Sequence, residues 1–128
     1  MSLQEELLGF AGSVGDMFRR RVAETPDGLA FLDPDRAPEG PNTWAGYTWA
    51  ESRKLVDQLA AGLLARGLAR EQRVGIISTT RLEWILLDLA VACAAGATTT
   101  VYPNTAAGDV EFILEDSGTC VAVVEDAA

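Results

Sequence analysis

The sequence predicts an α/β fold: a parallel sheet with helices on both faces, plus a short antiparallel hairpin. Helical and strand patterns alternate at short spacing over residues 47–124, which is typical of a parallel sheet layered with helices. The predicted strands at 74–77 and 121–124 are continuous apolar runs, as expected where both faces of a strand are covered. The order strand, helix, strand, helix, strand implies right-handed crossovers.

The predicted hairpin lies in the first part of the chain. Ser13 precedes an amphipathic pattern that predicts a helix to about Glu24, and residues 25–28 (TPDG) end it because proline cannot continue a helix. A strand is predicted at 29–32 and a second at 43–47, paired antiparallel. Residues 33–42 between them hold three of the five prolines, which indicates a surface loop within the domain rather than a linker.

Three predicted helices in the second part begin at threonines. Thr48 with Glu51, and Thr80 with Glu83, have the spacing of capping boxes, and Thr105 is the predicted cap of the third. Glycines 67, 96 and 118 are predicted to end these helices. The second helix has few polar positions, so we expect it to be covered nearly all round. The expected buried positions of the other two helices are Leu55, Val56, Leu59, Ala60, Leu63 and Leu64, and then Val110, Ile113 and Leu114.

Length and charge limit the possible functions. A chain of 128 residues is long enough for one domain with its own core, so we expect residues 1–128 to form a single unit in which residues 1–12 are flexible. The net charge is −9, which argues against a surface that binds nucleic acid. The run Arg19-Arg20-Arg21 fits the solvent-facing side of the first helix better than an anion site.

Both cysteines and the apolar segments point to a cytoplasmic protein. Cys93 and Cys120 stand in apolar surroundings with no metal-type spacing, so we expect two buried small side chains in a reducing compartment. The N-terminus lacks the pattern of a signal peptide. The most apolar segment, residues 85–97, contains Asp88 and is shorter than the roughly 20 residues that span a bilayer.

The sequence indicates no catalytic, cofactor-binding or metal-binding residue. There is no histidine, the commonest general base and metal ligand. The carboxylate pairs at 115–116 and 125–126 are interpreted as solvated surface, because neighbouring side chains on a helix point apart. Glycines 9, 12 and 15 follow no strand and so do not form a nucleotide-binding motif. Residues 78–80 (STT) follow a strand and precede a helix, so they either cap that helix or bind a phosphate; capping is the favoured interpretation.

Several motifs in order resemble adenylate-forming enzymes. Residues 47–49 (YTW) are similar to the segment near the start of those enzymes, although Ser52 stands where leucine is frequent. Residues 74–78 followed by 81–84 (RLEW) resemble a second stretch of the family, with Thr80 in place of the usual asparagine. Residues 94–97 (AAGA), 101–105 (VYPNT) and 113–117 (ILEDS) complete a pattern most like that of long-chain fatty acid–CoA ligases, and the likeness extends from about Phe18 onward.

The resemblance implies a two-step ligase that uses ATP, Mg²⁺ and coenzyme A. A fatty acid carboxylate attacks the α-phosphate of ATP to give an acyl-adenylate and pyrophosphate, and the thiol of coenzyme A then displaces AMP. The phosphate loop, the adenine and ribose motif and the catalytic lysine of the family have no counterpart here. We therefore expect a partial N-terminal domain that is inactive alone and associates as a homo-oligomer. Gly96 and Pro103 are expected to shape the ends of a strand, and Trp84 to fill a helix–helix seam rather than an acyl pocket.

Two other classes share these features. One is a different adenylating enzyme, such as an aryl-CoA ligase or the adenylation domain of a peptide synthetase. The other is a stand-alone, non-catalytic α/β module that binds a partner or a nucleotide. The early motifs do not separate a fatty acid–CoA ligase from these alternatives.

Overall fold

The computed structural model describes residues 12–36 and 43–126, and these form two β-sheets and four α-helices. The elements in chain order are α2 (Val14–Glu24), β1 (Leu29–Asp33), the 3-10 helix η1 (Pro34–Arg36), β2 (Ala45–Thr48), α3 (Trp49–Ala65), β3 (Arg73–Ile77), α4 (Leu82–Cys93), β4 (Ala97–Val101), α5 (Ala107–Asp116) and β5 (Thr119–Val124). The expected flexible segment 1–12, apart from Gly12, and the loop positions 37–42 lie outside the described residues.

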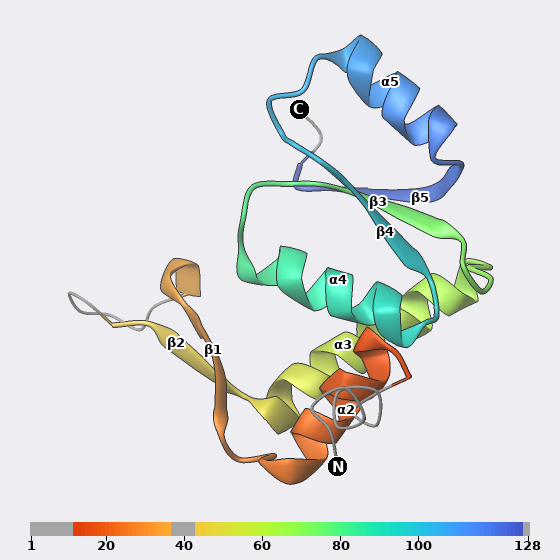
Figure 1. Cartoon of the computed structure of the whole chain (residues 1–128). Coiled ribbons are helices and arrows are strands. Elements are labelled where there is room, and N and C mark those ends of the chain that lie inside the picture. Colours follow the sequence, from red (N-terminus) through yellow and green to blue (C-terminus); the bar gives the residue numbers. More distant parts are fainter. Residues whose placement is uncertain (1–11, 37–42, 127–128) are drawn as a thin grey trace, which may run out of the picture.

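The parallel sheet has three strands in the order β4-β3-β5, so β3 is central. Val74 pairs with Thr98 on one side and with Val121 on the other, and both pairings are parallel. Helix α4 lies on one face of this sheet and α5 on the other (Figure 1). The predicted α/β class, with helices on both faces, is therefore confirmed.

The predicted hairpin is also confirmed, and it forms a separate sheet. Strands β1 and β2 pair antiparallel, with Phe31 opposite Tyr47. Figure 1 shows the hairpin standing away from the parallel sheet, where its strands lead from α2 and into α3. The first three residues of the loop between the strands form η1, and Asp33 just before them is buried at 2% exposure. Its carboxylate accepts a hydrogen bond from the Asp35 amide at 3.0 Å.

Helix α2 begins as the sequence predicts. The Ser13 hydroxyl accepts a hydrogen bond from the Asp16 amide at 3.1 Å, and the helix ends at Glu24. Phe18 and Val22 are buried in the core. The three consecutive arginines face solvent as expected; the Arg19 guanidinium donates to the Cys93 carbonyl, and that of Arg21 lies over the Trp49 ring.

Helix α3 has the capping box that its sequence predicts. The Thr48 hydroxyl accepts from the Glu51 amide at 3.1 Å, and the Glu51 carboxylate accepts from the Thr48 amide at 2.8 Å. The predicted apolar stripe is wider than the face that is buried, because Leu59 and Leu64 are 38% and 52% exposed. Gly67 follows the helix in a left-handed conformation with φ of 90°, as predicted for its C-terminal end.

Helix α4 is the centre of the structure. It packs against α3, α2 and β4, and none of its residues is exposed, as its nearly continuous apolar sequence predicts. The predicted Thr80 cap is wrong: the helix begins at Leu82, and its N-cap residue Arg81 makes no side-chain hydrogen bond to the helix amides. The sequence contained the residues of a capping box, but the chain enters the helix one residue later.

The end of α4 differs from the prediction in which residue turns the chain. Ala95, not Gly96, has the left-handed conformation, with φ of 60°. Gly96 is required for another reason: a Cβ atom there would lie 3.2 Å from the Gln72 carbonyl oxygen and 3.1 Å from a Val91 methyl. At the other end of β4, Pro103 occupies a turn closed by the hydrogen bond from the Thr105 amide to the Tyr102 carbonyl, which fits its predicted role after the strand.

Helix α5 and strand β5 are less covered than the sequence predicts. The N-cap of α5 is Ala106, so the predicted Thr105 cap is wrong. Its predicted core positions Val110, Ile113 and Leu114 are half-buried, and α5 buries no residue fully. Residues of β5 alternate between half-buried and exposed, which contradicts the prediction that both faces of this strand are covered. The predicted burial of both cysteines is wrong as well, because Cys120 in β5 is exposed and Cys93 at the end of α4 is half-buried.

Candidate functional site

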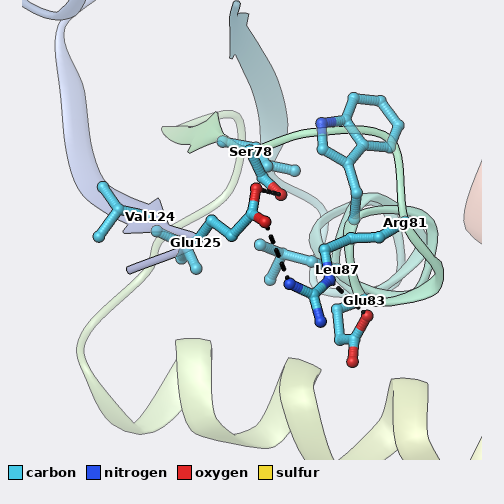
Figure 2. Close-up of a pocket in the computed structure, with 9 residues that line it drawn as sticks. Ser78, Arg81, Glu83, Leu87, Val124 and Glu125 are labelled. Carbon is cyan, nitrogen blue, oxygen red and sulfur yellow. Dashed lines mark hydrogen bonds and ion pairs between the residues drawn. The ribbon is translucent and has the colours of Figure 1, made fainter. Parts of the chain in front are cut away.

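The candidate site is a cavity of about 230 Å³ at the carboxyl ends of β3 and β5 (Figure 2). The chain leaves β3 for β4 on one side and returns to β5 on the other. Ligands of open α/β sheets bind beyond the strand ends at such a reversal. The residues that line the cavity are Ile76, Ser78, Arg81, Glu83, Trp84, Leu87, Val123, Val124 and Glu125.

The polar side of this cavity is built around the Glu125 carboxylate. Its Oε2 atom accepts hydrogen bonds from the Thr79 amide at 2.8 Å and the Thr79 hydroxyl at 2.7 Å. The Ser78 hydroxyl lies 3.3 Å from the same oxygen and 2.9 Å from the Thr79 carbonyl. The Oε1 atom of Glu125 lies 3.2 Å from Nη1 of Arg81. These donors, led by the Thr79 amide, lower the pKa of Glu125 because they stabilise its ionised form.

This arrangement corrects one interpretation of the sequence and adds a contact to another. Residues 78–80 were expected to cap α4, but the Thr79 amide and hydroxyl instead donate to a carboxylate of the chain itself. Glu125 is exposed, as expected for solvated surface, and its carboxylate is in addition engaged by the loop after β3. No local pattern signals the contact, because the partners lie 44 to 47 positions apart in the chain. The other carboxylate pair, Glu115 and Asp116, is exposed as predicted.

Charged groups of alternating sign continue from the cavity to the hairpin. The Arg81 guanidinium lies 2.9 Å from the Glu83 carboxylate. The same carboxylate lies 2.7 Å from the guanidinium of Arg36 in η1. The hydrogen bond from Arg81 is the largest cause that lowers the pKa of Glu83, and the pKa of Arg81 is raised by the same contact. The pKa of Arg36 is raised chiefly by its hydrogen bond with the Tyr47 hydroxyl.

Trp84 lies between this cavity and a second one of about 280 Å³, which is lined in addition by Ser78, Thr80, Thr100, Val101 and Tyr102. The indole is half-buried and packs against the core. Trp84 therefore does not fill a helix–helix seam as predicted, because it lines the space beyond the ends of β3 and β4. A third hollow, of about 400 Å³, runs between α3 and β5 and has mostly apolar walls, including Leu59, Leu63 and Val123.

These cavities could bind a ligand through apolar contacts. The charged side chains at the edge of the cavity beside Glu125 are already paired, so they leave no net charge free for a ligand. Arg81, Glu83 and Glu125 are paired with one another or with Arg36. Across residues 12–36 and 43–126, no group of three or more cysteine or acidic side chains is arranged to hold a metal ion. No helix in this described part is long and apolar enough to cross a membrane.

Comparisons with known proteins agree on one family. The profile of the AMP-binding enzyme family matches residues 18–128. The long-chain-fatty-acid–CoA ligase FadD15 of Mycobacterium bovis is 34% identical over 82 residues, which are 64% of this chain and 14% of the relative. The long-chain-fatty-acid–CoA ligase 6 of the mouse, Mus musculus, is 29% identical over 119 residues, or 90% of this chain and 16% of the relative.

A solved structure shows the same arrangement of elements. The fatty acyl CoA synthetase of Mycobacterium tuberculosis superposes with a TM-score of 0.78 at 27% identity, over 88% of this chain and 21% of that protein. The chain thus spans about a fifth or less of the length of these three relatives. The profile match covers most of the sequence and the fold agrees with it, so the chain belongs to the AMP-binding enzyme family.

Proposed function

We propose that this chain forms the N-terminal part of a long-chain fatty acid–CoA ligase. The reaction is ATP-dependent and requires Mg²⁺: a fatty acid becomes an acyl-adenylate, and coenzyme A then takes the acyl group as a thioester. The observation that carries the proposal is the family match over residues 18–128, together with relatives of 34% and 29% identity that are named as such ligases.

In this proposal the chain contributes structure and no catalytic, cofactor-binding or metal-binding residue. The charged groups that line the cavity at the ends of β3 and β5 pair with one another, and none of them is a histidine. The remainder of the ligase then supplies the phosphate loop and the catalytic lysine that the resemblance implies. ATP and coenzyme A are cytoplasmic substrates, and both cysteines are free thiols, so we place the enzyme in the cytoplasm.

The test compares the chain with the complete open reading frame that contains it. Purified residues 1–128 are mixed with ATP, Mg²⁺, palmitate and coenzyme A, and pyrophosphate release is measured. We expect no turnover above a blank without protein. The product of the complete reading frame is assayed alongside with palmitate, benzoate and a panel of amino acids, and we expect palmitate to give the highest rate.

Each contrary result points to a different alternative. Turnover by residues 1–128 alone would contradict the absence of catalytic groups. Preference of the complete product for benzoate would indicate an aryl-CoA ligase, and preference for an amino acid would indicate a peptide-synthetase adenylation domain. No adenylation by the complete product with any of these acids would favour a non-catalytic binding module.

A further inference from the structure

We propose that Glu125 is a positioning residue that fastens residues 78–81, the loop between β3 and α4, onto the end of β5. This fastening, which we call the Glu125 clasp, sets the mouth of the cavity at the carboxyl edge of the sheet. It is independent of the proposed ligase activity, because it concerns only the folded shape of the described residues.

The first support is the way that the carboxylate is used. One oxygen, Oε2, accepts from the Thr79 amide and the Thr79 hydroxyl, while Oε1 faces the Arg81 guanidinium at 3.2 Å. The Ser78 hydroxyl lies 3.3 Å from Oε2 and 2.9 Å from the Thr79 carbonyl, its nearer acceptor. Both oxygens therefore face donors. A glutamine at this position would place its NH₂ group against either Arg81 or Thr79, so only a carboxylate satisfies both sides.

The second support is that little else in the described residues fixes the loop. Helix α4 starts without a side-chain cap, and Thr80 is exposed. Arg81, the N-cap residue, is held between Glu125 and Glu83. The loop conformation thus depends on a residue 44 positions away rather than on local capping.

The third support is the position of the clasp on β5. Within the described sheet, β5 pairs only with β3. The pairing of β5 with β3 continues one residue beyond the end of β5, because the Glu125 amide donates a hydrogen bond to the Ile77 carbonyl at 3.2 Å. The Glu125 residue therefore joins β3 through its backbone and the following loop through its side chain. Figure 2 shows its carboxylate between the end of β5 and the side chains of Ser78 and Arg81.

The clasp also has a predicted pH dependence. The groups that face Glu125 are the hydroxyls and amide of residues 78–79 and the Arg81 guanidinium, with Glu83 on the far side of Arg81. These contacts lower the pKa of Glu125. The clasp is therefore intact above the ordinary glutamate pKa of about 4.3, and it opens as the pH falls through the lowered pKa of the folded state.

The test measures backbone amide exchange by NMR in the full chain and in three variants. In Glu125→Ala we expect the Thr79 amide to exchange at least about tenfold faster than in the parent, because its charged acceptor is gone. Glu125→Gln should give an intermediate increase. Amides inside α3, such as that of Val56, should keep their protection. The matched control is Glu111→Gln, which removes the same charge from an exposed position of α5 and should leave the Thr79 amide unchanged.

A second readout separates a clasp from general destabilisation. In the parent, the Thr79 amide chemical shift should titrate with an apparent pKa below about 4.3, and in Glu125→Gln that titration should vanish. Equal Thr79 exchange in the parent and in Glu125→Gln would overturn the proposal even if Glu125→Ala does not fold. So would a Thr79 shift that titrates identically in the parent and in Glu125→Gln.

Discussion

At the scale of single residues, Gly15 lies where the backbones of α2 and α4 approach each other closely. A Cβ atom there would lie 2.9 Å from the Ala92 carbonyl oxygen and 3.0 Å from the Cys93 Cα, whereas one at Gly62 in α3 would meet nothing within 4 Å. Gly15→Ala should lower the free energy of unfolding by about 1–3 kcal/mol through overpacking. Gly62→Ala should raise it by about 0.5–1 kcal/mol, because alanine favours the helix.

Denaturant unfolding of both glycine variants beside the parent tests this contrast. The two substitutions add the same methyl group to a helix, so helix propensity alone predicts stabilisation in both. A gain of stability in Gly15→Ala would therefore contradict the close approach of α2 and α4.

Trp84 gives a second prediction at the residue scale. Its indole packs against the core but is only half-buried, since it also lines two cavities. Trp84→Ala should lower the free energy of unfolding by about 1.5–3 kcal/mol, less than the roughly 3–5 kcal/mol of a fully buried tryptophan. Trp44, which is 53% exposed, provides the matched control, and Trp44→Ala should cost under about 1 kcal/mol. The melting temperatures of both variants are compared with that of the parent. An equal decrease in the two variants would contradict the packing of Trp84 against the core.

At the scale of elements, the threonines before the helices differ in what they do. Thr48 closes a capping box with Glu51, while the helices after Thr80 and Thr105 have N-caps without a side-chain hydrogen bond. Thr48→Ala should lower the free energy of unfolding by about 1 kcal/mol. Thr80→Ala, at an exposed position, should change it by less than about 0.5 kcal/mol. Urea denaturation measures both, and a cost for Thr80→Ala as large as that for Thr48→Ala would mean that Thr80 caps α4 after all.

At the scale of the whole molecule, the uncovered apolar surface leads us to predict association. The surface does not lie on α4, because none of the residues of that helix is exposed. It lies in the hollow between α3 and β5, where Leu59 is 38% and Val124 53% exposed beside an unpaired strand edge of the described sheet. Apolar patches and open strand edges favour pairing with another copy. We therefore expect a dimer or higher oligomer of this chain at micromolar concentration.

Light scattering after size-exclusion chromatography measures the mass of the particle. Leu59→Glu should shift the population toward monomer, because it places a charge in the hollow. Phe112→Glu is the control, since Phe112 is 66% exposed on α5, outside this hollow. A monomeric parent would contradict the prediction, and equal effects of the two variants would contradict the placement of the interface.

The order and type of the elements follow from local patterns in the sequence. The apolar run around Val74 and the pair Thr48 and Glu51 each specify their local structure through neighbouring residues. The family motifs could be recognised in the sequence because each of them is also a short contiguous segment. The sequence by itself therefore determined the α/β class, the hairpin and the family.

Only the tertiary structure decided which groups share a site. Thr80 has the spacing of a cap, but the entry of the chain into α4 depends on contacts of Ser78 and Thr79 with Glu125, more than forty positions away. The exposure of Cys120 and the half-burial of α5 likewise depend on what packs against them rather than on their own apolar patterns. Propensity and periodicity act over a few residues, whereas hydrogen bonds between strand ends and burial depend on packing between distant segments.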